Sequence, residues 1–351
     1  MTLTRRRRRT TIEDVARLAG VSNGAVSLAL SGRAGVADST RQRIIAAADE
    51  LGWRPSIGAR ALLSSRAFAV GLVLARDPEL LGADPFFPSF IAGVESELAK
   101  RNYSLVLQVV PDERAAEADA YARMAREGRA DGVFLADLRR GDVRLPLVES
   151  LGLPAVAVGR PTDRTSVPVV AIDDRVGVRE AVEHLVGLGH GRIAFVGGTP
   201  GYVHSASRLA AWRQAMRAAG LPPGPVVTSD FTGTGGAAAM TGLLESADPP
   251  TAVIFANDNM AIAAMSVASQ AGIALPDELS IVGFDDVPLA AHVNPPLTTV
   301  RQDVVTWGRV AAATLLAIVD DQPIVATPLP ASQLVLRSST ASAARSGRRG
   351  G

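Results

Sequence analysis

Residues 11–31, TIEDVARLAGVSNGAVSLALS, contain two short apolar-patterned segments separated by a tight turn. Thr11 is a good N-cap and apolar residues recur at helical spacing over 12–19, so a first helix is predicted here. Gly20 can adopt the left-handed backbone of a sharp turn, and Ser22 can cap a second helix. Two such helices match the helix-turn-helix arrangement, in which the second helix presents its first residues to DNA base edges. An ordinary helical hairpin is the alternative interpretation.

The following residues favour the first interpretation. A third helix is predicted from about Ser39, Thr40 or Arg41 to Leu51, with Gly52 able to end it. The segments TIEDVARLAGVS (11–22), VADSTRQRIIAAADELGWRPS (36–56) and ARALLSSR (59–66) together resemble the N-terminal signature of the lac-repressor family of bacterial transcription regulators. The resemblance extends to about Ala341.

The resemblance implies how the front of the chain contacts DNA. In the family, a short hinge helix forms on the operator, and a leucine from each subunit opens a base step in the minor groove. Here the hinge is expected at Ser56–Leu63. The residues expected to contact DNA are Thr11, Ser22, Asn23, Gly24, Ala25, Ser27, Leu28, Ser31, Ala59, Arg60 and the wedge Leu62. Base readout should depend mainly on Asn23, because Gly24 has no side chain and Leu28 offers only apolar contact.

The distribution of charge agrees with a DNA-binding front. Residues 1–70 contain twelve arginines and five acidic residues, a net charge of +7. Since the whole chain carries +1, residues 71–351 carry −6. Phosphate-binding charge is therefore concentrated at the front. The run Arg5–Arg9 can act as an arm on DNA, or can be a merely solvated tail.

Length and composition restrict the remaining possibilities. After the small front domain, the 351-residue chain is long enough for two α/β lobes with their own cores. The absence of cysteine excludes a thiol nucleophile and thiolate metal sites, and the four histidines lack i, i+4 metal spacing, so no metal or cofactor is expected. No apolar stretch is long enough to span a membrane, and no secretory signal follows the arginine run, so a cytoplasmic protein is expected.

The rest of the chain alternates apolar strands with amphipathic helices, which predicts parallel sheets covered on both faces. Strands are expected at 67–74, 104–110, 132–136, 155–158, 169–172, 192–196, 226–229, 252–255 and 280–283, and helices at 87–98, 113–127, 143–151, 177–188, 208–219, 235–246, 259–271 and 304–319. The predicted fold class is an N-terminal all-α helix-turn-helix domain followed by an α/β domain of two doubly wound lobes. The resemblance implies the two-lobed architecture of periplasmic sugar-binding proteins for the latter.

The expected domain boundaries follow from these patterns. They are a basic disordered arm at 1–10, the helix-turn-helix domain at 11–55, a hinge helix and linker at 56–66, a first lobe at 67–172 plus 298–325, a second lobe at 173–297 plus 326–340, and a disordered basic tail at 341–351.

Ligands of open α/β sheets bind beyond the carboxyl ends of the strands, here in the cleft between the lobes. The candidate effector-binding residues are Asp84, Phe86, Phe87, Arg160, Asp173, Arg208, Phe231, Asn257, Asp258 and Asp285. One of the two adjacent phenylalanines is expected to be core, and turn or cap carboxylates are the alternative for Asp258 and Asp285. The expected ligand is a sugar or sugar derivative.

Two other functional classes fit the sequence less well. Asp285 and Asp286 could form the acid–base pair of a glycosidase, but adjacent residues on a turn usually point apart. A free-standing sugar-binding protein is disfavoured by the fused DNA-binding front. The sequence therefore predicts a non-enzymatic, ligand-responsive repressor that binds a palindromic double-stranded DNA operator. A homodimer is expected rather than a tetramer, because residues 338–351 lack the leucine heptad that forms family tetramers.

Overall fold

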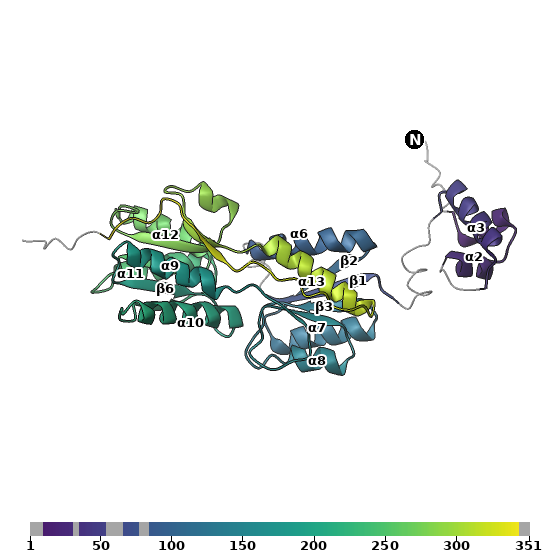
Figure 1. Ribbon diagram of the computed structural model, residues 1–351, viewed down its shortest axis with the longest axis horizontal. Helices are drawn as coiled ribbons and strands as arrows, with labels where there is room; N and C mark the ends of the chain where they lie inside the picture. Colours follow the sequence, from purple (N-terminus) through teal and green to yellow (C-terminus); the bar gives the residue numbers. More distant parts are fainter. Residues whose placement is uncertain (1–9, 31–34, 54–65, 77–83, 344–351) are drawn as a thin grey trace, which may run out of the picture.

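A computed structural model describes residues 10–30, 35–53, 66–76 and 84–343 (Figure 1). Its first elements are three helices, α1 (Ile12–Ala19), α2 (Asn23–Leu30) and α3 (Asp38–Glu50), which confirm the predicted helical front. Gly20 and Gly52 both have positive φ, at +64° and +59°, so each helix end that was expected to need a left-handed residue has one. The small apolar core that the helices share consists of Val15, Ala16, Ala19, Val26, Ala29, Ile44, Ala47 and Ala48.

The first lobe is built on a five-stranded parallel sheet in the order β2-β1-β3-β4-β5. Its strands are β1 (Ala69–Ala75), β2 (Ser104–Val110), β3 (Gly132–Leu135), β4 (Ala155–Val158) and β5 (Val169–Val170). Helices α6 (Phe86–Leu98) and α13 (Val304–Val319) cover one face, and α7 (Arg114–Arg126) and α8 (Arg144–Ser150) cover the other (Figure 1). Alternate side chains of β1 enter the two cores, because successive strand residues point to opposite faces.

One predicted strand differs from expectation in its burial. The sequence suggested that 104–110 was a buried strand, but β2 is the edge strand of its sheet. Leu107 and Val109 are exposed, and only Val110 of the strand is buried. The short η1 (Ala99–Arg101) precedes this strand and links it to α6.

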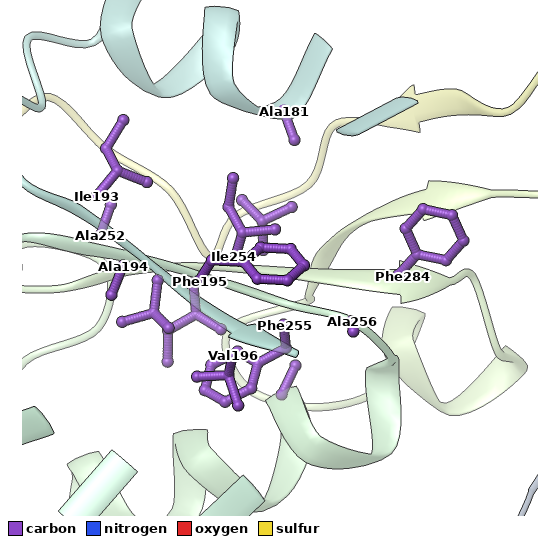
Figure 2. Close-up of a cluster of buried hydrophobic side chains, with 14 of the residues drawn as sticks. Ala181, Ile193, Ala194, Phe195, Val196, Ala252, Ile254, Phe255, Ala256 and Phe284 are labelled. Atoms are coloured by element: carbon purple, nitrogen blue, oxygen red, sulfur yellow. The ribbon is translucent and has the colours of Figure 1, made fainter. Parts of the chain in front are cut away.

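The second lobe contains a six-stranded sheet in the order β11-β10-β9-β8-β6-β7. The strands are β6 (Ile193–Gly197), β7 (Val226–Thr228), β8 (Ala252–Phe255), β9 (Ser280–Asp285), β10 (Thr298–Arg301) and β11 (Gln333–Val335), and the helices are α9 (Arg175–Gly187), α10 (Val203–Ala218), α11 (Gly233–Leu244), α12 (Asp258–Gln270) and η2 (Pro288–Ala291). All strand pairs are parallel except β10 with β11. Figure 2 shows the fully buried aromatic and aliphatic side chains of β6 and β8, including Phe195 and Phe255, packed between the helices of this lobe.

The chain passes between the lobes three times, at 171–174, 302–303 and 320–332. Residues 298–301 were expected in the first lobe, but they form β10, which pairs with β9 in the second sheet. That boundary is therefore corrected to 302. No helix within the described ranges is both long and apolar enough to cross a membrane.

Candidate DNA-facing helix and inter-lobe cavity

Helix α2 begins with a local cap that leaves its first residues accessible. The Ser22 hydroxyl accepts a hydrogen bond from the backbone N–H of Ala25 at 3.2 Å, which satisfies one of the free donors of the first turn. Asn23 and Gly24 then follow on the surface, and Leu28 lies one turn later, 37% exposed. The predicted contact residues Ala25 and Ser27 are half-buried beside them.

The other predicted DNA contacts are divided between a cap and the undescribed segments. Thr11 is the N-cap residue of α1, and its backbone N–H and its hydroxyl both donate to the Asp14 carboxylate at 3.0 Å. Four predicted contact residues lie outside the described residues: Ser31, Ala59, Arg60 and Leu62. The same holds for the predicted arm at 1–10, except Thr10, and for the predicted hinge helix and linker at 56–66, except Arg66.

A cavity of about 270 Å³ lies between the two lobes, at the carboxyl ends of both sheets. Eight of the ten predicted ligand residues line it: Asp84, Phe86, Arg160, Asp173, Arg208, Phe231, Asn257 and Asp285. The sheet topology explains this gathering, since polar residues that follow parallel strands meet at one edge. Two predictions are corrected. Phe87 is 1% exposed in the core of the first lobe, and Asp258 is fully buried, where it accepts hydrogen bonds from the Thr299 hydroxyl and the backbone N–H of Val287.

In the first lobe, the cavity is organised by an arginine that follows β1. Arg76 donates through Nε to Asp137 at 2.7 Å and through Nη1 to Asp84 at 2.6 Å. Burial alone would raise the pKa of the Asp137 carboxyl, but the charge and hydrogen bond of Arg76 outweigh it and hold that pKa below its ordinary value. This wall therefore presents an ion cluster of one arginine and two carboxylates.

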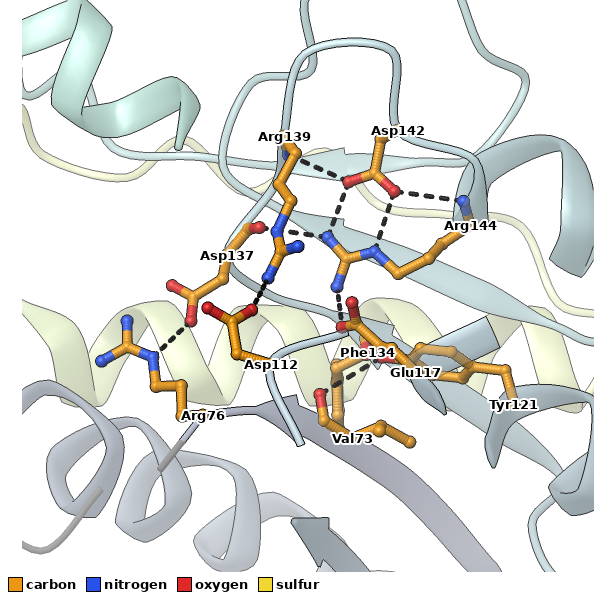
Figure 3. Close-up of polar contacts among 10 residues, drawn as sticks. All are labelled: Val73, Arg76, Asp112, Glu117, Tyr121, Phe134, Asp137, Arg139, Asp142 and Arg144. Atoms are coloured by element: carbon orange, nitrogen blue, oxygen red, sulfur yellow. Dashed lines mark hydrogen bonds and ion pairs between the residues drawn. The ribbon is translucent and has the colours of Figure 1, made fainter. Parts of the chain in front are cut away.

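A buried polar network fixes the loop that carries Asp137 (Figure 3). The Arg144 side chain is 3% exposed and pairs with Glu117 and Asp142, while it also donates to the Asp137 carbonyl. The Asp142 carboxylate accepts the backbone N–H of Arg139 at 3.0 Å. Next to this anchored segment, the Leu138 carbonyl accepts the backbone N–H of Val203 at 2.8 Å, a direct hydrogen bond between the lobes.

In the second lobe, Arg208 of α10 reaches the cavity from a rigid position. It donates to the Ala256 carbonyl at 2.7 Å and pairs with Asp174 at 3.3 Å, and its guanidinium carbon lies 3.7 Å from the Phe284 ring centroid. Stacking on an aromatic face and a fixed fork of donors suit it to hold ligand oxygens.

Asp285 ends β9 in an unusual environment. Its φ is +110°, a conformation that non-glycine residues rarely adopt. Burial raises the pKa of its carboxyl well above the ordinary range, and the nearby Arg208 only partly opposes this shift. The adjacent Asp286 instead contacts Arg301 and Arg337. The two carboxylates therefore point to different partners, as expected for neighbours on a turn.

Several residues that line the cavity were not predicted from the sequence. Arg76 and Gln302 directly follow β1 and β10, and Asp137 lies two residues after β3, so a search for polar residues after strands could have found them. Trp307 lies one turn into α13, and His204 lies in the first turn of α10, which begins five residues before its predicted start. Nothing in the local sequence marked those two as ligand-facing.

Comparison with known proteins agrees with both regions. Residues 11–56 match the family model for bacterial regulatory proteins of the lacI family, and residues 182–340 match that for a periplasmic binding protein-like domain. The chain is 36% identical over 315 residues to the HTH-type transcriptional regulator CelR of Thermobifida fusca, covering 89% of this chain and 92% of that protein. It is 35% identical to the regulator reg1 of Streptomyces lividans, covering 95% and 97%.

Solved structures show the same similarity in three dimensions. The lac repressor dimer bound to operator and the anti-inducer ONPF superimposes with a TM-score of 0.82 at 27% identity, covering 95% of this chain and all of that one. A complex of the transcriptional regulator CelR with cellobiose gives a TM-score of 0.69 at 33% identity, covering 94% and 100%. The chain therefore belongs to the lacI family of bacterial transcriptional regulators.

Proposed function

We propose that this protein is a transcriptional repressor of carbohydrate-utilisation genes that binds a near-palindromic operator as a homodimer in the cytoplasm and responds to a sugar in the inter-lobe cavity. The observation that carries the proposal is the cavity itself. The cavity lies between two lobes that each contribute polar groups from strand ends. A ligand that contacts both lobes therefore changes the free energy of one lobe arrangement relative to another.

The charge of the cavity supports an uncharged, hydroxyl-rich ligand. Three of the four lining arginines, Arg76, Arg175 and Arg208, are each paired with a carboxylate of the lining, at 2.6, 2.7 and 3.3 Å. The charge of the fourth, Arg160, helps to lower the pKa of Asp173. Bonding to Arg175 lowers the pKa of Asp173 to about 2, so that pair stays ionised. Paired charges offer directed donors and acceptors without demanding a counter-charge from the ligand.

Aromatic rings supply the apolar surface that a sugar ring needs. Phe86 and Trp307 meet edge to face with ring centroids 5.6 Å apart in the first lobe, and Phe231 lies on the second-lobe side. Apolar walls with a few placed polar groups are typical of small-ligand sites.

The operator-facing part of the proposal depends on α2. Asn23 is assigned to base readout, with Ser22, Ser27 and Ser31 positioning the backbone through phosphates and Leu62 wedging the minor groove. The homodimer is supported by the dimeric lac repressor–operator complex that the chain resembles.

The decisive experiment is operator binding measured against sugar concentration. A DNA library first identifies the preferred operator, and fluorescence anisotropy then follows binding in the presence of glucose, cellobiose and maltose. A two-fold symmetric binding motif and a saturable response to one sugar are expected. Sugar turnover by the purified protein, or sequence-independent DNA binding, would contradict the proposal.

A further inference from the structure

His204 lies in the wall of the cavity, held between two aromatic rings of the second lobe. Its ring centroid is 5.4 Å from that of Tyr202, almost parallel at 16°, and 5.4 Å from that of Phe231, tilted by 38°. Tyr202 is 5% exposed, and the guanidinium groups of Arg76 and Arg139 lie 5.7 and 5.4 Å from its ring centroid. The imidazole is therefore held between two aromatic rings of the second lobe, and one of these rings, Tyr202, also contacts arginines of the first lobe.

The imidazole is uncharged at neutral pH. Burial lowers the pKa of His204 to about 3, and the positive charges of Arg208 and Arg76 act in the same direction, whereas Asp137 opposes them. A neutral imidazole carries one N–H donor and one acceptor nitrogen. Among the residues that the structure describes, neither ring nitrogen of His204 has a hydrogen-bond partner.

Several other polar side chains of the cavity already have hydrogen-bond partners. Arg76 holds Asp84 and Asp137, and Arg208 holds Asp174 and the Ala256 carbonyl. Asn257 donates to the Phe231 carbonyl at 2.8 Å and caps α12 by accepting the N–H of Met260 at 3.0 Å. His204 thus combines a fixed position with an unused donor and an unused acceptor.

We propose that His204 is a specificity-determining residue of the effector site, which donates one hydrogen bond and accepts another from neighbouring hydroxyl groups of the ligand. The inference rests on the proposed function, because it takes the effector to be a sugar. A polar group that becomes enclosed by a ligand must be paired, so an analogue lacking the matching hydroxyl is rejected strongly. Sugars are then distinguished by the position of a hydroxyl rather than by charge.

The test compares two variants by isothermal titration calorimetry. His204→Phe keeps a planar ring between Tyr202 and Phe231 and removes both nitrogens. His204→Gln keeps a donor and an acceptor without the ring. Glucose, cellobiose and maltose are titrated first, followed by the monodeoxy analogues of whichever sugar binds the wild type.

The expected result is a loss of at least tenfold in sugar affinity for His204→Phe and partial recovery in His204→Gln. One monodeoxy analogue should bind the wild type at least tenfold more weakly than the parent sugar does. On His204→Phe, that analogue and the parent sugar should have equal affinities. Such a cycle identifies the hydroxyl that contacts the imidazole, which a purely structural role would not reproduce.

Several results would overturn the inference. Parent-sugar affinity in His204→Phe equal to wild type would do so, as would deoxy analogues that lose the same factor on both proteins. Operator affinity without sugar checks that each variant is folded. If His204→Phe fails this check, His204→Gln decides the question. A His204→Gln variant with the same sugar affinity and the same deoxy-sugar profile as the wild type would then overturn the inference. If the wild type binds operator but none of the sugars, the proposed sugar response itself fails, which is a distinguishable outcome.

Discussion

Asp320 pairs with Arg66 at the far end of α13, and Arg66 also donates through Nη2 to the Val319 carbonyl at 2.9 Å. Arg66 is the first described residue after 54–65, so the chain that arrives from the DNA-binding domain is fastened to the C-terminal end of this helix. The N-terminal end of the same helix lies at the cavity, where Gln302 and Trp307 are lining residues. Helix α13 thus connects the ligand site with Arg66, where the chain from the DNA-binding domain enters the first lobe.

This connection predicts the behaviour of Asp320→Asn. The variant should bind sugar and operator separately as the wild type does, but the sugar should change operator affinity less, with a loss of about 1 kcal/mol of coupling free energy. Because both arginines paired with Asp320 are more than one third exposed, the unfolding free energy should fall by less than about 1 kcal/mol. Operator titrations at increasing sugar concentration measure the coupling.

The neighbouring Asp321 provides a matched control. It is exposed on the same turn, so Asp321→Asn makes the same change of charge without removing the Arg66 anchor. Indistinguishable response curves for the two variants would show that the anchor carries no coupling.

Two glycines of the helix-turn-helix predict opposite effects of the same substitution. Gly24 is exposed within α2, and a Cβ there would meet only the Ser22 Oγ at 3.8 Å, an ordinary contact. Gly24→Ala should therefore stabilise the DNA-binding domain by roughly 0.5 to 1 kcal/mol, since alanine is the better helix former. Gly20 has φ of +64°, so Gly20→Ala should destabilise it by about 1 kcal/mol or more despite open space around it. Urea unfolding followed by circular dichroism measures both, and a stabilised Gly20→Ala would contradict the turn geometry.

The strands were predictable because continuous apolar runs determined them, and β2, β4 and β8 have the predicted bounds. The features that the sequence did not predict depend on tertiary neighbours. The exposure of β2 follows from its place at the sheet edge, and β11 is a three-residue antiparallel strand whose pairing with β10 is non-local. Helix α10 begins after Tyr202, which gives none of the usual capping signals, so its start and His204 were missed.

The cavity was also predictable only in part: its residues at strand ends were found, but the directions of their side chains were not. Residues directly after strands were found because parallel strands end at one edge. The direction of each side chain was not predictable from sequence: Asn257 lines the cavity while its neighbour Asp258 turns inward to Thr299, and Phe86 lines it while Phe87 enters the core.

The buried Asp258 predicts a pH dependence of stability. Burial raises the pKa of its carboxyl to about 7 in the folded protein, above the unfolded value of about 4. The folded state therefore binds a proton that the unfolded chain has released, so the stabilising contribution is full below about pH 4 and is lost as the pH rises through 7. Asp258→Asn is neutral at every pH and should remove roughly 2 kcal/mol of the decrease in unfolding free energy between pH 5 and pH 8.

Urea unfolding at pH 5 and pH 8 measures this difference for wild type and variant. Asp285, whose pKa is also raised by burial, contributes a slope of the same sign that remains in Asp258→Asn. A variant with an unchanged slope would show that the Asp258 carboxyl is ionised throughout this range.

The last prediction concerns the protonation state in which Asp285 meets the ligand. Burial raises the pKa of this carboxyl well above its ordinary range, and we expect the group to meet the ligand as a neutral acid with one donor and one acceptor oxygen. Asp285→Asn reproduces that pattern and shape, so its sugar affinity at pH 7 should stay within about threefold of wild type. Asp285→Ala removes both groups beside Arg208 and Gln302 and should cost roughly 1 to 3 kcal/mol in sugar binding, with operator affinity in the absence of sugar unchanged. Calorimetry with the responsive sugar measures both variants, and Asp286→Asn is the control, because Asp286 faces Arg301 and Arg337 rather than the cavity. An Asp285→Asn variant as weak as Asp285→Ala would mean that the ligand requires the ionised carboxylate, and the neutral-acid assignment would be wrong.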